Sequence, residues 1–140
     1  MNTKCDRLYE VMFVLDPDLA EEETDKIIEA LATQISGQGG QVNKVEKIGR
    51  QRLAYMIRKG SRKFYEGTYI LLHVNGTGRE IAETERRLRV LDPVIRFLTV
   101  RVDEDLKRAA KIKARRERRL EMRAARQASE ANGAAPEGEE

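Results

Sequence analysis

The sequence contains little of what disulfide bonds, metal sites and membrane spans require. Its 140 residues include one cysteine, Cys5, and one histidine, His73. One thiol cannot form an internal disulfide, and one Cys with one His cannot supply a zinc-type cluster of ligands. No apolar run approaches the roughly 20 residues of a membrane-spanning helix, and the opening MNTKCDRLYE has no apolar core of the secretory kind. We therefore expect a soluble, cytoplasmic protein with no metal and no membrane association.

Motifs that cradle phosphate or activate a nucleophile are also missing. The chain has neither a GxxxxGKS or GxxxxGKT loop nor a GxGxxG after a strand, and GQGG at 37–40 is placed to end a helix. His73 has no Cys or Asp placed by the sequence to orient it. The carboxylates at 21–23 point in different directions on a helix, where the helix dipole explains them. We expect no catalytic residue, no cofactor and no small-molecule substrate.

Charge divides the chain into three parts. Residues 1–105 carry 17 basic and 18 acidic side chains, residues 106–126 carry 10 basic and two acidic ones, and residues 127–140 carry four glutamates. The net charge of +3 thus hides a neutral body, a segment of +8 and an end of −4. The segment AAKIKARRERRLEMRAAR can neutralise phosphates and release counterions, although such blocks also serve as solubilising tails.

Apolar periodicity predicts the order strand, helix, strand, strand, helix, strand. Residues 8–15 and the second half of 63–74 are apolar on both faces, as is typical of central strands. The first helix is expected to be capped by Asp16 or Asp18, and the second by a capping box of Thr77 and Glu80. The other predicted strand segments, of which the first must slip phase or lie at an edge, are 41–49, 52–57 and 92–102.

This order is that of the split βαβ, ferredoxin-like plan. We predict an α+β domain with a four-stranded antiparallel sheet, strands one and three in its centre, and both helices on one face because the crossovers are right-handed. The other face would be open to RNA or to a second protein. The predicted organisation is an N-terminal extension at 1–6, the domain at 7–103, a basic helical extension at 104–128 and a disordered acidic tail at 129–140.

The stretch GRQRLAYMIRKGSRKFYEGTY, residues 49–69, holds six Arg or Lys against one Glu. Arg50 and Arg52 are two apart, so they project from the same face of an extended strand. Three further cations lie on the hairpin that returns beside it: Lys59, Arg62 and Lys63. We interpret the stretch as a positive patch on a neutral body. The alternative is an ordinary hairpin edge whose charges only discourage strand addition by other molecules.

Three motifs in this order resemble those of a known family, the sixth protein of the bacterial small ribosomal subunit. They are RLYE at 7–10, GRQRLAYMIRK at 49–59 with Gly67 and Tyr69 after it, and LDPVIRFLTVRV at 91–102. The resemblance implies a ferredoxin-like fold, no enzymatic activity, and binding to small-subunit (16S) ribosomal RNA on the platform. It also implies a protein partner, ribosomal protein eighteen of the small subunit (bS18).

The expected RNA contacts come from two sources. The resemblance implies Arg7, Arg50, Arg52 and Lys59, while charge and position alone add Arg62, Lys63, Arg115, Arg116, Arg118 and Arg119. Met56 stands where the family usually has proline, so the local geometry after Tyr55 is expected to differ. Two other hypotheses stay open, namely a standalone RNA-binding regulator and a small-molecule-binding or catalytic domain on the same fold.

Overall fold

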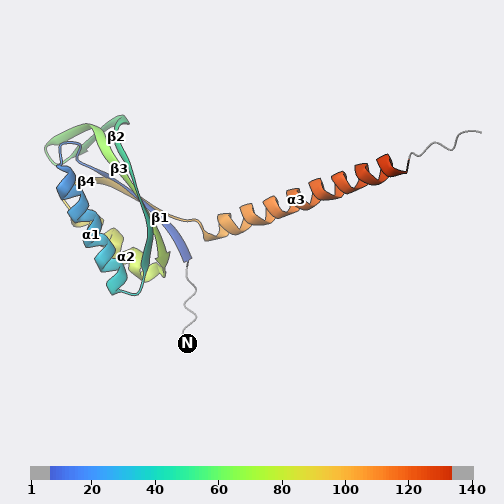
Figure 1. Cartoon of the computed structure of the whole chain (residues 1–140). Coiled ribbons are helices and arrows are strands. Elements are labelled where there is room, and N and C mark those ends of the chain that lie inside the picture. The colour runs from blue at the N-terminus through green and yellow to red at the C-terminus, as the bar shows by residue number, and fades with distance from the viewer. Residues whose placement is uncertain (1–6, 134–140) are drawn as a thin grey trace, which may run out of the picture. The chain divides into compact units, whose positions relative to one another are not determined.

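The structure is a computed structural model that describes residues 7–133 (Figure 1). The chain divides into two compact units after Asp103. The first unit is a sheet with two helices, and the second is formed by one long helix. The predicted extension at 1–6, with Cys5, and residues 134–140 of the predicted acidic tail lie outside the described residues. Within the described part, no helix is both long and apolar enough to cross a membrane.

Four antiparallel strands form the sheet of the first unit in the order β2-β3-β1-β4. The central strands are β1 (Arg7–Leu15) and β3 (Arg62–Gly76), and the edge strands are β2 (Gln41–Lys59) and β4 (Val94–Arg101). The two helices, α1 (Glu21–Gly37) and α2 (Gly78–Val90), lie on one face of the sheet (Figure 1). The predicted ferredoxin-like plan, with strands one and three in the centre, is confirmed.

The main core lies between this face of the sheet and the two helices. Alternate residues of the central strands point into it and are fully buried against the inner sides of the helices. Its largest members are Phe13, Leu15, Leu31, Ile35, Ile70, Leu72 and Leu88. Burying one such side chain contributes about 1.5–3 kcal/mol, so this layer supplies most of the stabilisation of the unit.

A smaller apolar cluster lies on the opposite, open face at one end of the sheet. It consists of Val14, Leu53, Phe64 and Ile95. The pairing of β2 with β3 makes it possible, because Arg52 faces Glu66 and Ile57 faces Phe64, so the four residues 53–56 oppose Tyr65 alone. This four-residue bulge turns Leu53 into the cluster and bends the strand. The slip predicted for 41–49 is confirmed at two places, Val42/Lys44 and Lys47/Gly49, and the segment also lies at the sheet edge, whereas the bulge at 53–56 was not predicted.

The two helices of the sheet unit begin differently. The capping box of α2 is confirmed, since the Glu80 carboxylate accepts a hydrogen bond from the Thr77 N–H at 2.9 Å. The predicted cap of α1 by Asp16 or Asp18 is wrong, because the N-cap residue is Ala20 and no side-chain cap hydrogen bond is made there. The Asp16 carboxylate instead accepts the Asp18 N–H at 3.0 Å, which closes the turn before the helix.

The second unit contains α3 (Asp103–Asn132), a helix of 30 residues with no buried side chain. It continues through residues 129–132, which the sequence had placed in a disordered tail. The reason is visible in its last turns, where Arg126 Nε lies 3.1 Å from Glu130 Oε1 and so ties one turn to the next.

Candidate nucleic-acid interface

Four of the predicted RNA-contacting cations surround one depression at the end of the β2–β3 hairpin. Arg50 and Arg52 come from β2, and Arg62 and Lys63 come from β3. The depression is shallow, has a volume of about 410 Å³ and is completed by Pro17, Asp18, Phe64, Tyr65 and Glu66. We call it the cationic depression. The hairpin forms it because antiparallel pairing sets the start of β3 beside the second half of β2.

Ion pairs divide these four cations into two kinds. The Arg50 Nε donates a hydrogen bond to Glu66 Oε2 at 2.7 Å, and its Nη2 lies 2.5 Å from the same oxygen. In contrast, Arg52 and Lys63 are exposed and have no hydrogen-bond or ion-pair partner within residues 7–133. Their charges are therefore available to a phosphate without breaking an internal contact.

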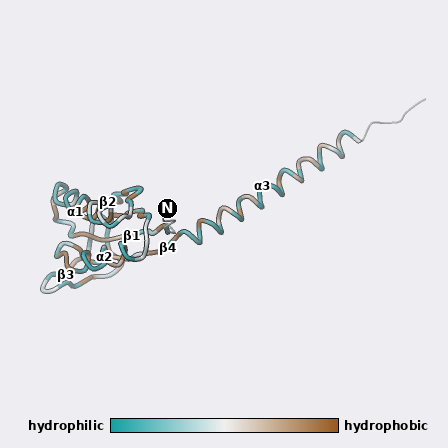
Figure 2. The backbone as a smooth tube through the Cα atoms, turned by 90° about the horizontal axis from the view of Figure 1, so that it is seen from below, coloured by the Kyte–Doolittle hydropathy of each residue, from teal (hydrophilic) through white to brown (hydrophobic). Residues whose placement is uncertain are grey.

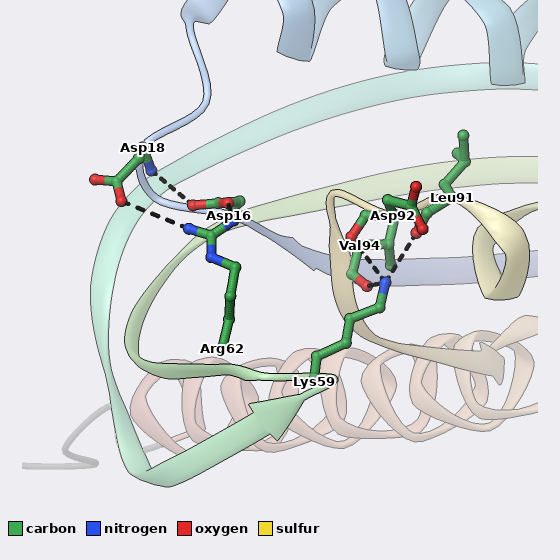
Figure 3. Close-up of polar contacts among 7 residues, drawn as sticks. All are labelled: Asp16, Asp18, Lys59, Arg62, Leu91, Asp92 and Val94. Carbon is green, nitrogen blue, oxygen red and sulfur yellow. Dashed lines mark hydrogen bonds and ion pairs between the residues drawn. The ribbon is translucent and has the colours of Figure 1, made fainter.

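Arg62 links the hairpin to the loop between β1 and α1 (Figure 3). Its Nη1 donates to Asp16 Oδ2 at 2.5 Å, and its Nη2 lies 3.8 Å from Asp18 Oδ2. The guanidinium also lies over the Phe64 ring, with 4.8 Å from Cζ to the ring centroid. Because Asp16 is only 9% exposed, its carboxylate depends on this cation for charge compensation. Arg62 therefore has a structural role at the rim of the depression.

Lys59 has a role that the sequence did not suggest. Its Nζ donates to three backbone carbonyls, those of Leu91 at 3.0 Å, Asp92 at 2.8 Å and Val94 at 2.6 Å (Figure 3). An ammonium group has three hydrogens, so all of them are used. The side chain fastens the hairpin to the connection between α2 and β4 and keeps no N–H for a phosphate. We therefore correct its predicted assignment and leave it out of the interface.

The remaining predicted contacts lie elsewhere. Arg7 is exposed and faces Gly76 at the far end of β3, about 45 Å along that strand from its start at Arg62. It cannot share the cationic depression. The other four predicted contacts lie on α3, in the second unit, and all are exposed: Arg115, Arg116, Arg118 and Arg119.

Two exposed tyrosines accompany the cations, and sequence reasoning did not select either as a site residue. Tyr65 lines the depression and is 61% exposed. Tyr55 lies in the bulge of β2, where the Arg96 Cζ is 5.7 Å from its ring centroid. Exposed aromatic rings next to cations are surfaces on which unpaired bases stack. The only sequence signal was the alternation of Phe64, Tyr65 and Glu66, which predicts opposite faces for neighbouring residues.

His73 lies at the centre of the open face, between carboxylates from both neighbouring strands. Its Nδ1 is 3.7 Å from Glu10 Oε1, and its Nε2 is 3.4 Å from Glu46 Oε1 without hydrogen-bond geometry. Glu46 also pairs with Lys44 at 2.5 Å, and this contact is the main reason why the pKa of Glu46 is lowered. The arrangement is a cross-strand charge cluster with no nucleophile beside the imidazole.

Comparison with known proteins assigns the family. A family model described as Ribosomal protein S6 matches residues 8–101. The small ribosomal subunit protein bS6 of Acidobacterium capsulatum is 54% identical over 117 residues, which are 84% of this chain and 80% of that protein. The corresponding protein of Koribacter versatilis is 48% identical over 125 residues, which are 89% of this chain and 82% of that protein.

A solved structure agrees with these matches. The crystal structure of 30S ribosomal protein S6 from Thermotoga maritima is 32% identical to this chain and has a TM-score of 0.66, with 77% of this chain and 98% of that chain covered. The chain therefore belongs to the Ribosomal protein S6 family, a family of structural, non-enzymatic proteins of the small ribosomal subunit.

Proposed function

We propose that this protein binds small-subunit (16S) ribosomal RNA through its β2–β3 hairpin and does so together with the small-subunit protein bS18 on the platform. It acts as a structural constituent of the ribosome in the cytoplasm. The observation that carries the proposal is the cationic depression, where the side chains of Arg52 and Lys63 have no partner within residues 7–133 and the exposed Tyr65 also lines the depression. Family membership argues against the alternative of an enzyme.

The depression suits phosphates better than bases. Arginine and lysine contacts to phosphate fix the position of a protein on RNA but read no sequence. Specificity would then come from the shape of the RNA and from the partner protein. Two linked surfaces raise the effective concentration of the second contact, so joint binding is tighter than either binding event alone.

The open face of the sheet supports the part of the proposal that concerns a protein partner. Met12 of β1 has Leu71 of β3 on one side and Leu98 of β4 on the other, which makes an apolar row across three strands. Leu98 is 63% exposed, and Val100 farther along β4 is also exposed. An apolar row of this kind attracts a protein surface and not phosphates. We therefore assign the hairpin to the RNA and the open face to bS18.

The test replaces the two unpaired cations of the depression. We expect Arg52→Glu with Lys63→Glu to weaken binding of the protein and bS18 to a platform fragment of the RNA at least about tenfold, which corresponds to ~1.4 kcal/mol. The control is Lys26→Glu with Arg79→Glu, which makes the same charge change at exposed, unpaired cations on α1 and α2. A gel-shift titration at one salt concentration compares them. Equal affinities of the two folded variants would contradict the assignment of the hairpin.

A further inference from the structure

The cations of α3 lie on one side of the helix. Ten Lys or Arg occur between Lys107 and Arg126. At about 100° per residue, nine of them fall within about half of the circumference, and the face runs about 28 Å along the axis. We call this the cationic face, and its members are Lys107, Arg108, Lys111, Arg115, Arg116, Arg118, Arg119, Arg123 and Arg126. The opposite half consists mainly of alanines, with Leu106, Leu120, Glu117 and Glu121.

Ion pairing follows the same division. Lys113, the one cation off the face, lies 4.0 Å from Glu117 on its own side of the helix. On the face, Arg108 is 3.8 Å from Asp105, and Arg126 pairs with Glu130. The other seven cations are exposed and have no ion-pair or hydrogen-bond partner within the described residues: Lys107, Lys111, Arg115, Arg116, Arg118, Arg119 and Arg123.

These unpaired charges lie close to one another. Lys107, Lys111, Arg115, Arg119 and Arg123 follow each other at spacings of four residues, so each is a neighbour of the next on the helix surface. Each like-charge pair at this spacing destabilises a helix by a few tenths of a kcal/mol. No buried side chain of α3 offsets this repulsion. A bound polyanion would remove it, because each neutralised phosphate places a negative charge beside the row.

The width of the cationic face indicates whether it contacts the phosphates of one nucleic-acid strand or of two. Lys107 and Arg118 lie at one edge, and Arg116 and Arg123 lie at the other, about 140–180° away around the axis. A single row of phosphates cannot reach both edges. The two rows that border the wide, shallow minor groove of double-stranded RNA can, because one row lies on each side of a protein helix placed along that groove. We propose that the cationic face of α3 binds double-stranded RNA by contacting phosphates of both strands along one groove, without reading sequence.

The composition of α3 argues against the other polyanion, an acidic membrane. A membrane-surface helix needs bulky apolar side chains opposite its cations. The opposite half of α3 offers mainly alanine methyl groups and two glutamates, and the helix is hydrophilic along most of its length (Figure 2).

The matches to two relatives extend into α3, since their lengths of 117 and 125 residues exceed that of the sheet unit, which ends at Asp103.

The proposal rests on the proposed function only in naming ribosomal RNA as the natural duplex, and it is tested separately. The full-length chain is titrated with a 20-base-pair RNA of arbitrary sequence, with a single strand of the same length, and with vesicles containing anionic lipid. Fluorescence anisotropy at several KCl concentrations gives the salt slope for the RNAs. We expect tighter binding to the duplex than to the single strand, and no binding to the vesicles at the same salt.

Variants of the face supply the second measurement. We expect Lys111, Arg115, Arg119 and Arg123 changed together to Gln to reduce the salt slope by up to about 3.6, at about 0.9 per lost phosphate contact. Glutamine is a good helix former, and circular dichroism checks that the helix remains. Lys111→Gln and Lys113→Gln form a matched pair, since they remove the same charge on opposite sides. Only the first is expected to lower the slope, by about one.

The results separate this proposal from the assignment of the hairpin. Equal binding to duplex and single strand, equal slopes for the matched pair, or binding to vesicles but not to duplex would each overturn it. Binding of the Arg52→Glu, Lys63→Glu variant to the arbitrary duplex with an unchanged salt slope supports a separate site on α3. If the unmodified protein with bS18 does not bind the platform fragment although it binds the arbitrary duplex, the result would count against the function proposed for the hairpin alone.

Discussion

Neighbouring cations of the hairpin differ in what they can bind, because their internal partners differ. Lys59 gives all three N–H groups to carbonyls that lie 32 to 35 residues away in the sequence. Lys63, four residues later, has no partner within residues 7–133. The family resemblance predicted Lys59, and charge and position predicted Lys63, as phosphate contacts. Only the fold distinguishes them, since the acceptors of Lys59 are backbone atoms that every sequence has and that no residue pattern reveals.

This difference predicts opposite effects of the same substitution. Lys59→Met leaves carbonyls between α2 and β4 without their donor, so we expect the free energy of unfolding to fall by about 1–3 kcal/mol. Lys63→Met removes an exposed, unpaired charge and should change stability by less than about 0.5 kcal/mol. Urea unfolding measures both. RNA titration should show the reverse order, with Lys63→Met the weaker binder, and a stable Lys59→Met protein with reduced RNA affinity would show that our assignment of Lys59 is wrong.

At the scale of elements, the sequence predicted what depends on local periodicity and on short motifs. β1 and the second half of β3 are apolar on both faces, and α2 begins with a capping box, so the strand order and the second helix could be predicted. The N-cap of α1 and the four-residue bulge at 53–56 could not be predicted from the sequence. In both cases a contact across the fold decides the local shape: the pairing of Asp16 with Arg62, and the burial of Leu53 against Val14 and its neighbours.

In the candidate site, too, one part of the arrangement could be predicted from the sequence and another could not. Proximity of Arg50, Arg52, Arg62 and Lys63 was predictable, because two short segments joined by a turn must lie side by side. Which of these cations already has a partner could not be predicted. Strand register brings Glu66 to Arg50, and the loop that leads into α1 brings Asp16 to Arg62. The sequence therefore located the patch, and the structure determined which of its charges are free.

Glu46 of edge strand β2 is stabilised in its charged form mainly by Lys44 of the same strand, and this contact predicts a pH dependence. The hydrogen bond from Lys44, then its charge, and then His73 hold the pKa of Glu46 below 4.5. Because the folded state has the lower pKa, ionised Glu46 contributes stability above the unfolded value, and this is lost as pH falls through the folded value. We expect Glu46→Gln to lower the urea midpoint slightly at pH 7 and by a smaller amount at pH 3.

The comparison for this prediction is Glu29→Gln, which changes an exposed glutamate of α1 that has no ion pair in the described chain. Its urea midpoint should follow that of the parent protein at both pH values. The effect at Glu46 is small because the carboxylate is solvent-exposed and screened. An equal loss of stability in Glu46→Gln at pH 7 and pH 3 would mean that packing, and not the charge, is responsible.

At the scale of the whole molecule, stability and the net positive charge belong to different units. The sheet unit has the apolar core and is close to neutral, with 17 basic and 18 acidic residues up to position 105. α3 has no buried side chain and carries the segment of +8. Folding therefore depends on one unit, while long-range attraction to a polyanion depends mainly on the other. A chain organised in this way can gain or lose affinity for RNA without any change in its core.

Removal of α3 tests this separation directly. We expect a chain that ends at Asp103 to keep its melting temperature within about 2 °C, because no buried contact of α3 is lost and the sheet unit retains its whole core. Its salt slope for RNA binding should fall by up to about six, since seven unpaired cations are removed at about 0.9 each. Calorimetry and anisotropy measure the two quantities on the same samples. A large fall in melting temperature would show that α3 stabilises the sheet unit, whereas an unchanged slope would show that its charges serve only solubility.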